Sequence, residues 1–529
     1  MPPSVVHLPN GNDVTVAPIF GGLNFKASEL SRHPTPFPPG WTIIIHSEDS
    51  DESHDGGSPL PSPDFDLGPR KKHHTHRFQK PTLRNDHLFI SSISNPASSD
   101  FKPAISPTRQ IAMMLWTTLW WYFHQPEPEV QVENAASAKT TPAGRPKGDW
   151  RVTINREGIF KGKHLLQKLE RMGLIINDDS SVGADTSREG IAEAWPQAYV
   201  TRRHFWQLDA RIFLFTLSPM INSPFPSGSP AHSRPASPNR ANILKADNTG
   251  AVTPPFGLQQ TSWSTTDPFH SSSHLPTYFP PAPPTYIWTG NTRHPKRPKA
   301  PRQGEIFYTR YIPSLGETLS LRVASLSSRA VPHSPSLPSG MGLRPLTGAS
   351  DTTIPTLSGI SDGPSDVELL HKWMNDPRVA YSWGEDGPIE HQREFLEGGL
   401  KLKHSFPVIG CFDGKPFAYF EIYWVKEDRL GAHLGGSIGE WDRGFHCLVG
   451  EQEFRGSHRV KVWLSALVHY CLLADPRTNA VMLEPRVDNE KLRRYCEDVG
   501  FFKEREITFP HKQSNLMKIL RETWEAPCL

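Results

Sequence analysis

A long stretch rich in proline and serine divides the chain near its middle and limits what it can fold into. Between about residues 219 and 302 the sequence includes SPFPSGSPAHSRPASPNR and FPPAPPTYIWTGNTRHPKRPKAPR. Because a compact domain rarely contains so long a structureless loop, we expect a disordered insertion between two folded parts. Its Ser-Pro pairs leave a regulatory role open beside that of a spacer. Excision of residues 223–299 should then leave the fold nearly unchanged.

The rest of the chain indicates an α/β (α+β) protein. The 529 residues include 53 Pro, 39 Gly and only 36% hydrophobic residues, so the chain should bury less apolar surface than its length suggests. We expect five segments: an N-terminal α/β domain at 1–218, the disordered insertion at 219–302, a strand segment at 303–325, a linker at 326–359 and a C-terminal domain at 360–525.

Two segments support a folded N-terminal domain. SPTRQIAMMLWTTLWWYFHQ begins with a helix-start signal and is apolar over about four turns, so it predicts a buried helix. DWRVTINREGIFKGKHLLQKLERMGLII predicts a strand, a turn, a helix and a second strand. We therefore expect an independent core in this part of the chain.

Charge and cysteine content exclude several classes of partner. Lys+Arg of 57 against Asp+Glu of 55 gives a net charge of +2, too little for a nucleic-acid surface. No apolar run reaches the roughly 18 residues of a membrane span, so no membrane partner is expected. The five cysteines have no CxxC spacing, which indicates reduced thiols and no metal site. The ending EAPCL has Cys528 where a peroxisomal address has a basic residue, which favours the cytoplasm over the peroxisome.

The C-terminal part alternates helices and strands. SDVELLHKWMNDPRV predicts a capped helix, and SFPVIGCFDGKPFAYFEIYWV predicts two strands joined at Asp413-Gly414. A strand at GFHCLVG, a loop and an apolar helix follow, and then AVMLEP, NEKLRRYCEDV and FFKEREITF predict strand, helix and strand. This order indicates one α/β unit.

The loop EFRGSH feeds the apolar helix and is a candidate phosphate site. Unpaired amides at a helix N-terminus attract phosphate oxygens, Gly456 allows close approach, and Arg455, His458 and Arg459 add positive charge. A simple strand-to-helix turn is the alternative interpretation.

The order of these elements resembles the acyl-CoA-dependent GNAT acyltransferase superfamily, in which the strand before this loop splays from its neighbour. LHKWMNDPRVAYSWGEDG, GFHCLVGEQEFRG and LEPRVDNEKLRRYCEDVGF resemble the siderophore hydroxamate acyltransferases of the aerobactin and mycobactin type, especially their fungal N5-hydroxyornithine branch. Of the superfamily loop pattern this chain keeps Gly456, with Glu453 and His458 at the other motif positions. The bacterial relatives have Asp and Arg where it has Arg486 and Asp488. A degenerate GNAT-like repeat is an alternative for the N-terminal domain.

The resemblance implies an N-acyltransferase that transfers an acetyl group from acetyl-CoA to N5-hydroxy-L-ornithine, making a hydroxamate for a ferrichrome- or ferricrocin-type siderophore. Two alternatives stay open: transfer of an anhydromevalonyl group for extracellular siderophores, and a non-catalytic scaffold of the pathway. Other siderophore-pathway enzymes are possible partners.

The resemblance also implies roles for individual residues. His446 matches the family histidine and would act as the base, although a core histidine is the alternative. Asp488 would orient it or bind the ammonium group of the acceptor, unless it is only a helix cap. Trp383 and Glu385 would face the amino-acid acceptor, with a core role as the alternative for Trp383. The residues expected to contact CoA are Leu448, Val449, Arg455, Gly456, Ser457, His458, Arg459 and Asn489.

Overall fold

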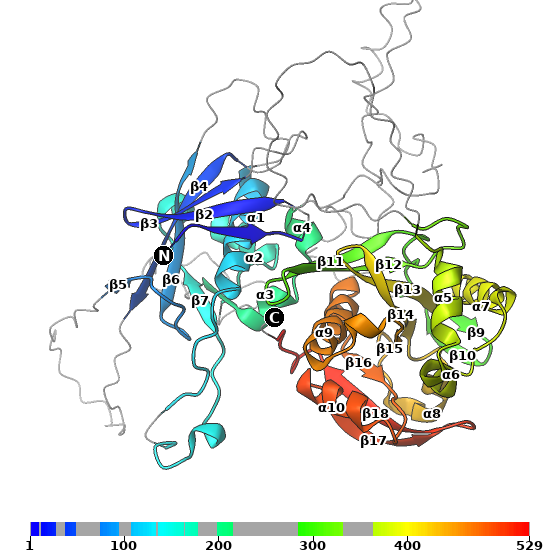
Figure 1. Cartoon of the computed structure of the whole chain (residues 1–529). Coiled ribbons are helices and arrows are strands. Elements are labelled where there is room, and N and C mark those ends of the chain that lie inside the picture. The colour runs from blue at the N-terminus through cyan, green and yellow to red at the C-terminus, as the bar shows by residue number, and fades with distance from the viewer. Residues whose placement is uncertain are drawn as a thin grey trace, which may run out of the picture.

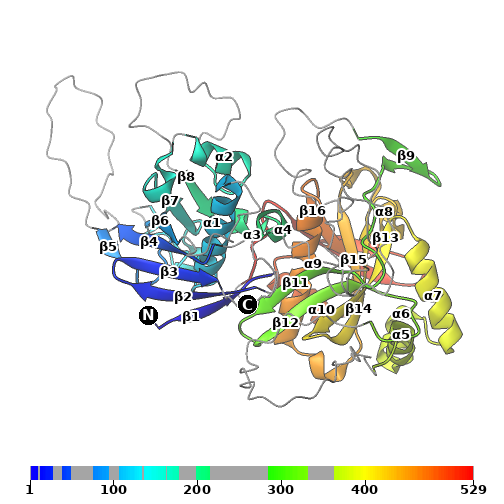
Figure 2. The same cartoon turned by 90° about the horizontal axis from the view of Figure 1, so that it is seen from above.

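The chain forms two parts that lie side by side (Figures 1 and 2). The computed structural model describes residues 2–9, 12–27, 38–48, 75–94, 107–133, 136–162, 164–177, 198–214, 284–331 and 363–527. Each part is built on one eight-stranded sheet. Most of the expected insertion and linker lies outside the described residues.

The N-terminal part is a mixed sheet with the order β1-β2-β3-β4-β6-β7-β8, with β5 paired to β4. Its strands are β1 (Ser4–His7), β2 (Asp13–Ile19), β3 (Gly22–Ala27), β4 (Gly40–Glu48), β5 (Thr75–Arg77), β6 (Asp86–Ser94), β7 (Arg151–Ile154) and β8 (Ala198–Thr201). Its helices are α1 (Pro107–Phe123), η1 (Pro142–Gly144), η2 (Gly158–Lys161), α2 (Leu165–Arg171), α3 (Arg202–Trp206) and α4 (Ala210–Leu214). Helix α1 is buried from Ala112 to Phe123, which confirms the predicted core helix.

The C-terminal sheet has the order β11-β12-β13-β14-β15-β16-β18-β17. Its strands are β11 (Ile306–Ile312), β12 (Glu317–Val323), β13 (Ser405–Phe412), β14 (Lys415–Trp424), β15 (Arg443–Val449), β16 (Ala480–Leu483), β17 (Phe502–Thr508) and β18 (Gln513–Leu520). Its helices are α5 (Asp366–Met374), α6 (Pro377–Trp383), α7 (Ile389–Lys401), α8 (Arg429–Leu434), η4 (Gly435–Ser437), η5 (Gln452–Phe454), α9 (Ser457–Ala474) and α10 (Glu490–Asp498). All neighbours pair antiparallel except β15 and β16, which are parallel and joined through α9.

The two sheets share part of their topology. In each, a run of antiparallel strands is followed by a helix, a parallel strand, a second helix and an antiparallel strand: β6-α1-β7-α2-β8 in one, β15-α9-β16-α10 and then β18 in the other. This order supports the GNAT-like repeat. The two parallel strand pairs, β6–β7 and β15–β16, differ in what lies beside the first strand. In the N-terminal sheet η2 lies against β6, since a Cβ on Gly158 would meet the Ile90 carbonyl oxygen at 2.1 Å. That edge of β6 is therefore covered.

Two sequence predictions need correction at the centre of the chain. Residues 284–302, assigned above to the disordered insertion, contain the hairpin β9 (Tyr286–Thr289) and β10 (Thr292–Pro295). The following Arg297 forms a buried bidentate ion pair with Glu427, both distances being 2.6 Å. The segment at 303–325 supplies β11 and β12, which belong to the C-terminal sheet, so that sheet starts well before residue 360.

One hydrophobic core runs through both parts and joins them. Where they meet, His469 Nε2 on α9 donates to the Trp206 carbonyl oxygen at 2.5 Å, and His469 Nδ1 accepts from the Tyr308 hydroxyl at 2.9 Å. Arg202 donates to the carbonyl oxygen of Ala526 at 2.6 Å, which holds the C-terminal segment in the junction (Figure 1). The N-terminal part thus contacts α9, the helix that begins at the candidate phosphate loop. Within the described residues, no helix is long and apolar enough to cross a membrane.

Candidate active site

The C-terminal sheet opens at its parallel step. Strand β15 pairs with β16 only through Arg443 and Gly444, whereas its pairing with β14 continues to Val449. Beyond Gly444 the edge of β15 that faces β16 has no strand partner among the described residues. This confirms the splay that the resemblance implied, and it leaves the backbone of Leu448 and Val449 beside the opening.

The loop after β15 presents free amides at the start of α9. Gly456 is the N-cap of that helix, with φ +150°, a conformation that favours glycine, and no side chain caps the helix. The amides of Arg459 and Val460 donate to the Gly456 carbonyl, while those of Ser457 and His458 have no acceptor within the described part of the chain. Two amides and the positive end of an 18-residue helix therefore suit an anionic group.

The three basic residues of this loop have different surroundings. Arg459 forms a bidentate ion pair with Glu317 on β12 and stacks on the rings of Phe412 and Phe454. Arg455 donates to the Val449 carbonyl at 2.7 Å. His458 is exposed and has no ion pair or hydrogen bond among the residues described. Of the predicted phosphate ligands, His458 is thus the side chain left uncommitted, and Arg455 and Arg459 hold the loop in place.

Strand register places three ionisable side chains in a row across β14, β15 and β16. Glu421 lies directly opposite His446 in the β14–β15 pair. Gly444 pairs with Met482, so Glu484, two residues after Met482, reaches the face and height of His446, two residues after Gly444. His446 Nδ1 lies 3.0 Å from Glu421 Oε2, and its Nε2 lies 2.8 Å from Glu484 Oε1.

Further hydrogen bonds fix the two carboxylates. The hydroxyl of Tyr423 donates to Glu484 at 2.9 Å, and that of Tyr419 donates to Glu421 at 2.9 Å. Lys512 Nζ lies 3.7 Å from Glu484. The Glu484 side chain is only 5% exposed, whereas that of His446 is 32% exposed, so the ring can be reached from solvent.

This arrangement makes His446 a cation. Carboxylates only accept hydrogen bonds, so contacts from both ring nitrogens require a proton on each. Burial lowers the pKa of His446, but Glu484 and Glu421 outweigh burial and raise the pKa well above 6.5. For Glu484 burial acts in the opposite direction and raises the pKa, but His446, Lys512 and Tyr423 lower that pKa to about 2. The expected neutral base is therefore part of a charged group of three, the His446 triad (Glu421, His446 and Glu484).

The side chains predicted to face the acceptor lie next to this triad. The ring of Trp383, at the end of α6, is 6.3 Å from that of His446 and nearly perpendicular to it. Trp383 also makes an edge contact with Tyr419, at 5.7 Å. Glu385 pairs with His391 at 2.9 Å. Burial is the largest cause that raises the pKa of Tyr419, and the nearby carboxylates of Glu421 and Glu385 raise it further. Trp383 is half-buried, so it is not wholly a core residue.

Asp488 does not contact His446, so the predicted orienting role is wrong, while its binding of the acceptor's ammonium group stays a prediction. Its carboxylate pairs with Arg486 at 3.1 Å and accepts from the Tyr381 hydroxyl at 3.2 Å, and it is half exposed. Orientation of His446 falls instead to Glu421 and Glu484. Asp488 is not the helix cap either, because the side chain of Asn489 caps α10 by accepting from the Leu492 amide. The reason is register: Asp488 lies four residues after Glu484, beyond the end of β16.

Sequence reasoning missed Glu421, Glu484 and their tyrosine partners. Glu421 interrupts the otherwise apolar run AYFEIYW, and Glu484 ends the buried strand AVML. A charge in either place is costly unless it is paired, which was a usable signal. What the sequence does not contain is the register that brings both carboxylates to one histidine.

A strand that splays from its neighbour, followed by free amides at the start of a long helix, is the arrangement of a GNAT-type N-acyltransferase. Residues 362–509 match the family described as acetyltransferase (GNAT) domain. The N5-hydroxyornithine acetylase of Beauveria bassiana is 44% identical over 97% of this chain and 100% of its own length. The chain belongs to the family of that acetylase.

Other relatives match the C-terminal part. The N(6)-hydroxylysine O-acetyltransferase of Escherichia coli is 41% identical over 42% of this chain and 58% of its own length. The N(5)-hydroxyornithine:cis-anhydromevalonyl coenzyme A-N(5)-transacylase of B. bassiana is 36% identical over 43% of this chain and 42% of its own. Among solved structures, aminoglycoside acetyltransferase AAC(6')-Ib with coenzyme A is 23% identical and covers 30% of this chain and 91% of its own, with a TM-score of 0.27.

Proposed function

We propose that the chain acetylates N5-hydroxy-L-ornithine with acetyl-CoA, giving the hydroxamate used in ferrichrome- or ferricrocin-type siderophore biosynthesis. The observation that carries this proposal is the 44% identity to an N5-hydroxyornithine acetylase over 97% of this chain and 100% of that one. Identity to the anhydromevalonyl transacylase is 36% and covers less than half of either chain. Acetyl is therefore the favoured acyl group. Cytoplasmic localisation stays a prediction.

Acetyl-CoA would lie in the opening between β15 and β16. Its pantetheine would pair with the free backbone of Leu448 and Val449, and its pyrophosphate would accept from the amides of Ser457 and His458. The His458 side chain would add a donor there. The contact expected between Asn489 and CoA stays a prediction, as does acceptor binding by Trp383 and Glu385.

The chemistry needs one proton removed and one supplied. The uncharged hydroxyamino nitrogen attacks the thioester carbonyl, a C–N bond forms, and the carbonyl oxygen becomes an oxyanion. The nitrogen then loses a proton to the His446 triad, the C–S bond breaks, and the CoA thiolate receives a proton as it leaves. Because both ring nitrogens of His446 carry protons and donate to the carboxylates, the proton acceptor in the triad is a carboxylate oxygen of Glu421 or Glu484, and the imidazolium can supply the proton that the thiolate takes up.

The direct test is product formation by the purified chain. Incubation with N5-hydroxy-L-ornithine and acetyl-CoA should release CoA thiol and give a hydroxamate, which forms a coloured iron(III) complex. L-Ornithine is the control, because its δ-amine is protonated at neutral pH and should give little product. A chain that neither binds acetyl-CoA in a calorimeter nor forms product from either amine would instead favour the scaffold alternative.

A further inference from the structure

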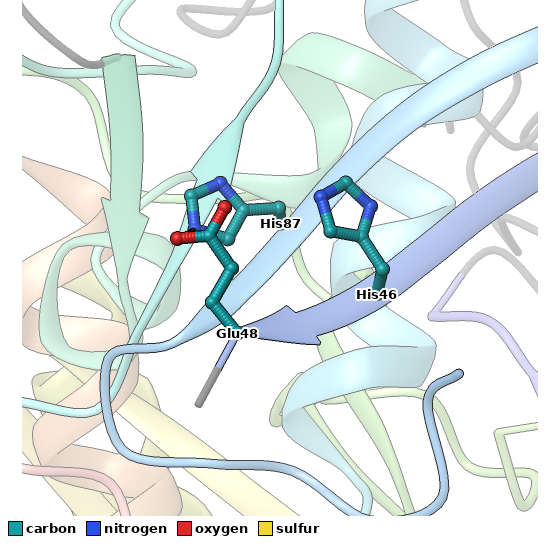
Figure 3. Close-up of side chains that lie close together, drawn as sticks. All are labelled: His46, Glu48 and His87. Carbon is teal, nitrogen blue, oxygen red and sulfur yellow. Dashed lines mark ion pairs between the residues drawn. The ribbon is translucent and has the colours of Figure 1, made fainter. Parts of the chain in front are cut away.

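Three metal-ligating side chains meet on one face of the N-terminal sheet, away from the acyltransferase site (Figure 3). His46 on β4 pairs directly with His87 on β6 in the antiparallel register, so both rings project from the same face. Glu48 follows His46 by two residues and returns to that face. His46 and Glu48 are half-buried, and His87 is 9% exposed. Their closeness follows from the strand pairing.

The spacing of the three suits one small cation. One ligand atom from each residue lies within 4.8 Å of the other two, and His87 Nε2 is 3.5 Å from Glu48 Oε2. The two imidazole rings are nearly parallel, at 10°, with centroids 5.3 Å apart. Ligands about 2.0–2.1 Å from a tetrahedral zinc ion lie about 3.3 Å from one another. The His87–Glu48 distance of 3.5 Å is close to this value, and the distances to His46, which are within 4.8 Å, would shorten by up to about 1.5 Å.

A fourth residue fixes the His87 ring in the form that binds metal. The side-chain oxygen of Asn155, just after β7, lies 3.0 Å from His87 Nδ1, and it accepts a hydrogen bond from that nitrogen. The Asn155 backbone is itself tied to β6, because its amide donates to the Leu88 carbonyl at 2.9 Å. With its proton on Nδ1, His87 turns the Nε2 lone pair toward Glu48. A cation between these two electron-rich atoms would replace repulsion by two bonds.

The surroundings of His46 lower its pKa. Burial is the main cause that lowers the pKa of His46, and the neighbouring His87 lowers it further. The carboxylates of Glu48, Glu157 and Asp86 act in the opposite sense without reversing the shift. Their negative charge would also favour a cation at this position.

We propose that His46, Glu48 and His87 bind a divalent first-row transition-metal ion, and that Asn155 is a positioning residue for His87. Two imidazoles and one carboxylate suit Zn²⁺ or Fe²⁺, whereas Mg²⁺ and Ca²⁺ prefer oxygen ligands. Three protein ligands leave a position for water. The ion would tie the ends of β4 and β6 together and stabilise the N-terminal part.

Titration of the chelator-treated full chain tests the proposal. Zn²⁺ should bind at one site per chain in a calorimeter and raise Tm, and Co²⁺ at the same site should give visible absorption bands that Zn²⁺ abolishes. Glu48→Gln and His46→Ala should lose that site. Asn155→Ala should bind Zn²⁺ about 10–100-fold more weakly, the usual effect of losing the partner of a ligating histidine. His164→Ala, at an exposed histidine of the same domain, is the matched control and should bind like the parent.

The variants also separate a lost site from a lost fold. Glu48 is one-third exposed, so Glu48→Gln should keep the circular dichroism spectrum of the parent while losing the Co²⁺ bands. Equal Zn²⁺ affinity in the parent, His46→Ala and Glu48→Gln would place the bound zinc on other histidines and overturn the proposal. Competition of Fe²⁺ against Co²⁺ decides which of the candidate ions binds more tightly.

Discussion

Replacement of Glu484 by glutamine separates the chemistry of the His446 triad from its structural effect. Glu484→Gln keeps the shape and removes the charge that lies 2.8 Å from His446 Nε2. The remaining carboxylate, Glu421, then holds the imidazolium alone, so the pKa of His446 should fall. Since the triad would lose a proton acceptor, kcat should drop by about 10²–10⁴-fold. KM for acetyl-CoA should change little, because no CoA contact is removed.

The same change should cost stability, and the cost should depend on pH. Breaking a buried ion pair typically costs about 3–5 kcal/mol. The raised pKa of His446 stabilises the fold fully below 6.5 and less as pH rises through the folded value. The lowered pKa of Glu484 stabilises it above 4.5, with loss as pH falls toward about 2. The difference in Tm between parent and variant should therefore be largest between about pH 4.5 and 6.5.

Glu427→Gln is the matched control, because Glu427 is also buried and paired with a histidine and an arginine, His294 and Arg297. It should lower Tm to a similar extent while the folded enzyme keeps its kcat. Stopped assays at saturating substrates, with the folded fraction measured by circular dichroism, make the comparison. If Glu484→Gln kept kcat within about threefold of the parent, less than general acid-base catalysis normally supplies, the triad would not handle the proton.

Three further predictions follow from other contacts. His458→Ala should raise KM for acetyl-CoA and leave kcat unchanged, whereas Lys461→Ala, one turn further along α9, should change neither in the same steady-state assay. Asp488→Asn should alter kcat far less than His446→Ala does, and it should change the free energy of unfolding by less than ~0.5 kcal/mol, because Asp488 pairs with Arg486 at the surface. A loss of kcat as large as that of His446→Ala would contradict this placement. Arg297→Met should lower the urea midpoint by the equivalent of about 3–5 kcal/mol, since it leaves Glu427 buried without its bidentate partner, and an unchanged midpoint would show that the β9–β10 hairpin does not stabilise the domain.

Much of the C-terminal fold could be predicted from local signals. Apolar periodicity, the Asp413-Gly414 turn and the capping box at Ser365 each specify structure within a few residues. The hairpin at 286–295 could not, because its polar and aromatic residues resemble the proline-rich sequence before it. Its stability comes from Glu427, which is 130 residues from Arg297 in the chain.

The site was predictable as far as it depends on a motif. His446 and Gly456 lie in recognisable sequence surroundings, and the structure places His446 on β15 and Gly456 at the start of α9, the helix that follows this strand. The partners of His446 depend on long-range register, since Glu421 precedes it by 25 residues and Glu484 follows it by 38. The same limit applies to His46 and His87, which come together through the pairing of β4 with β6. Sequence patterns report which face a side chain takes, but not which strand lies beside it.

Acyl-donor preference tests the central claim most directly. The measurement is kcat/KM for acetyl-CoA and for anhydromevalonyl-CoA, with N5-hydroxy-L-ornithine as the common acceptor and the hydroxamate product identified by mass. We predict that acetyl-CoA is preferred by on the order of 10²-fold, about the limit that differences in acyl size allow in a single pocket. Equal values, or a preference for anhydromevalonyl-CoA, would contradict the assignment of this chain as an acetyltransferase.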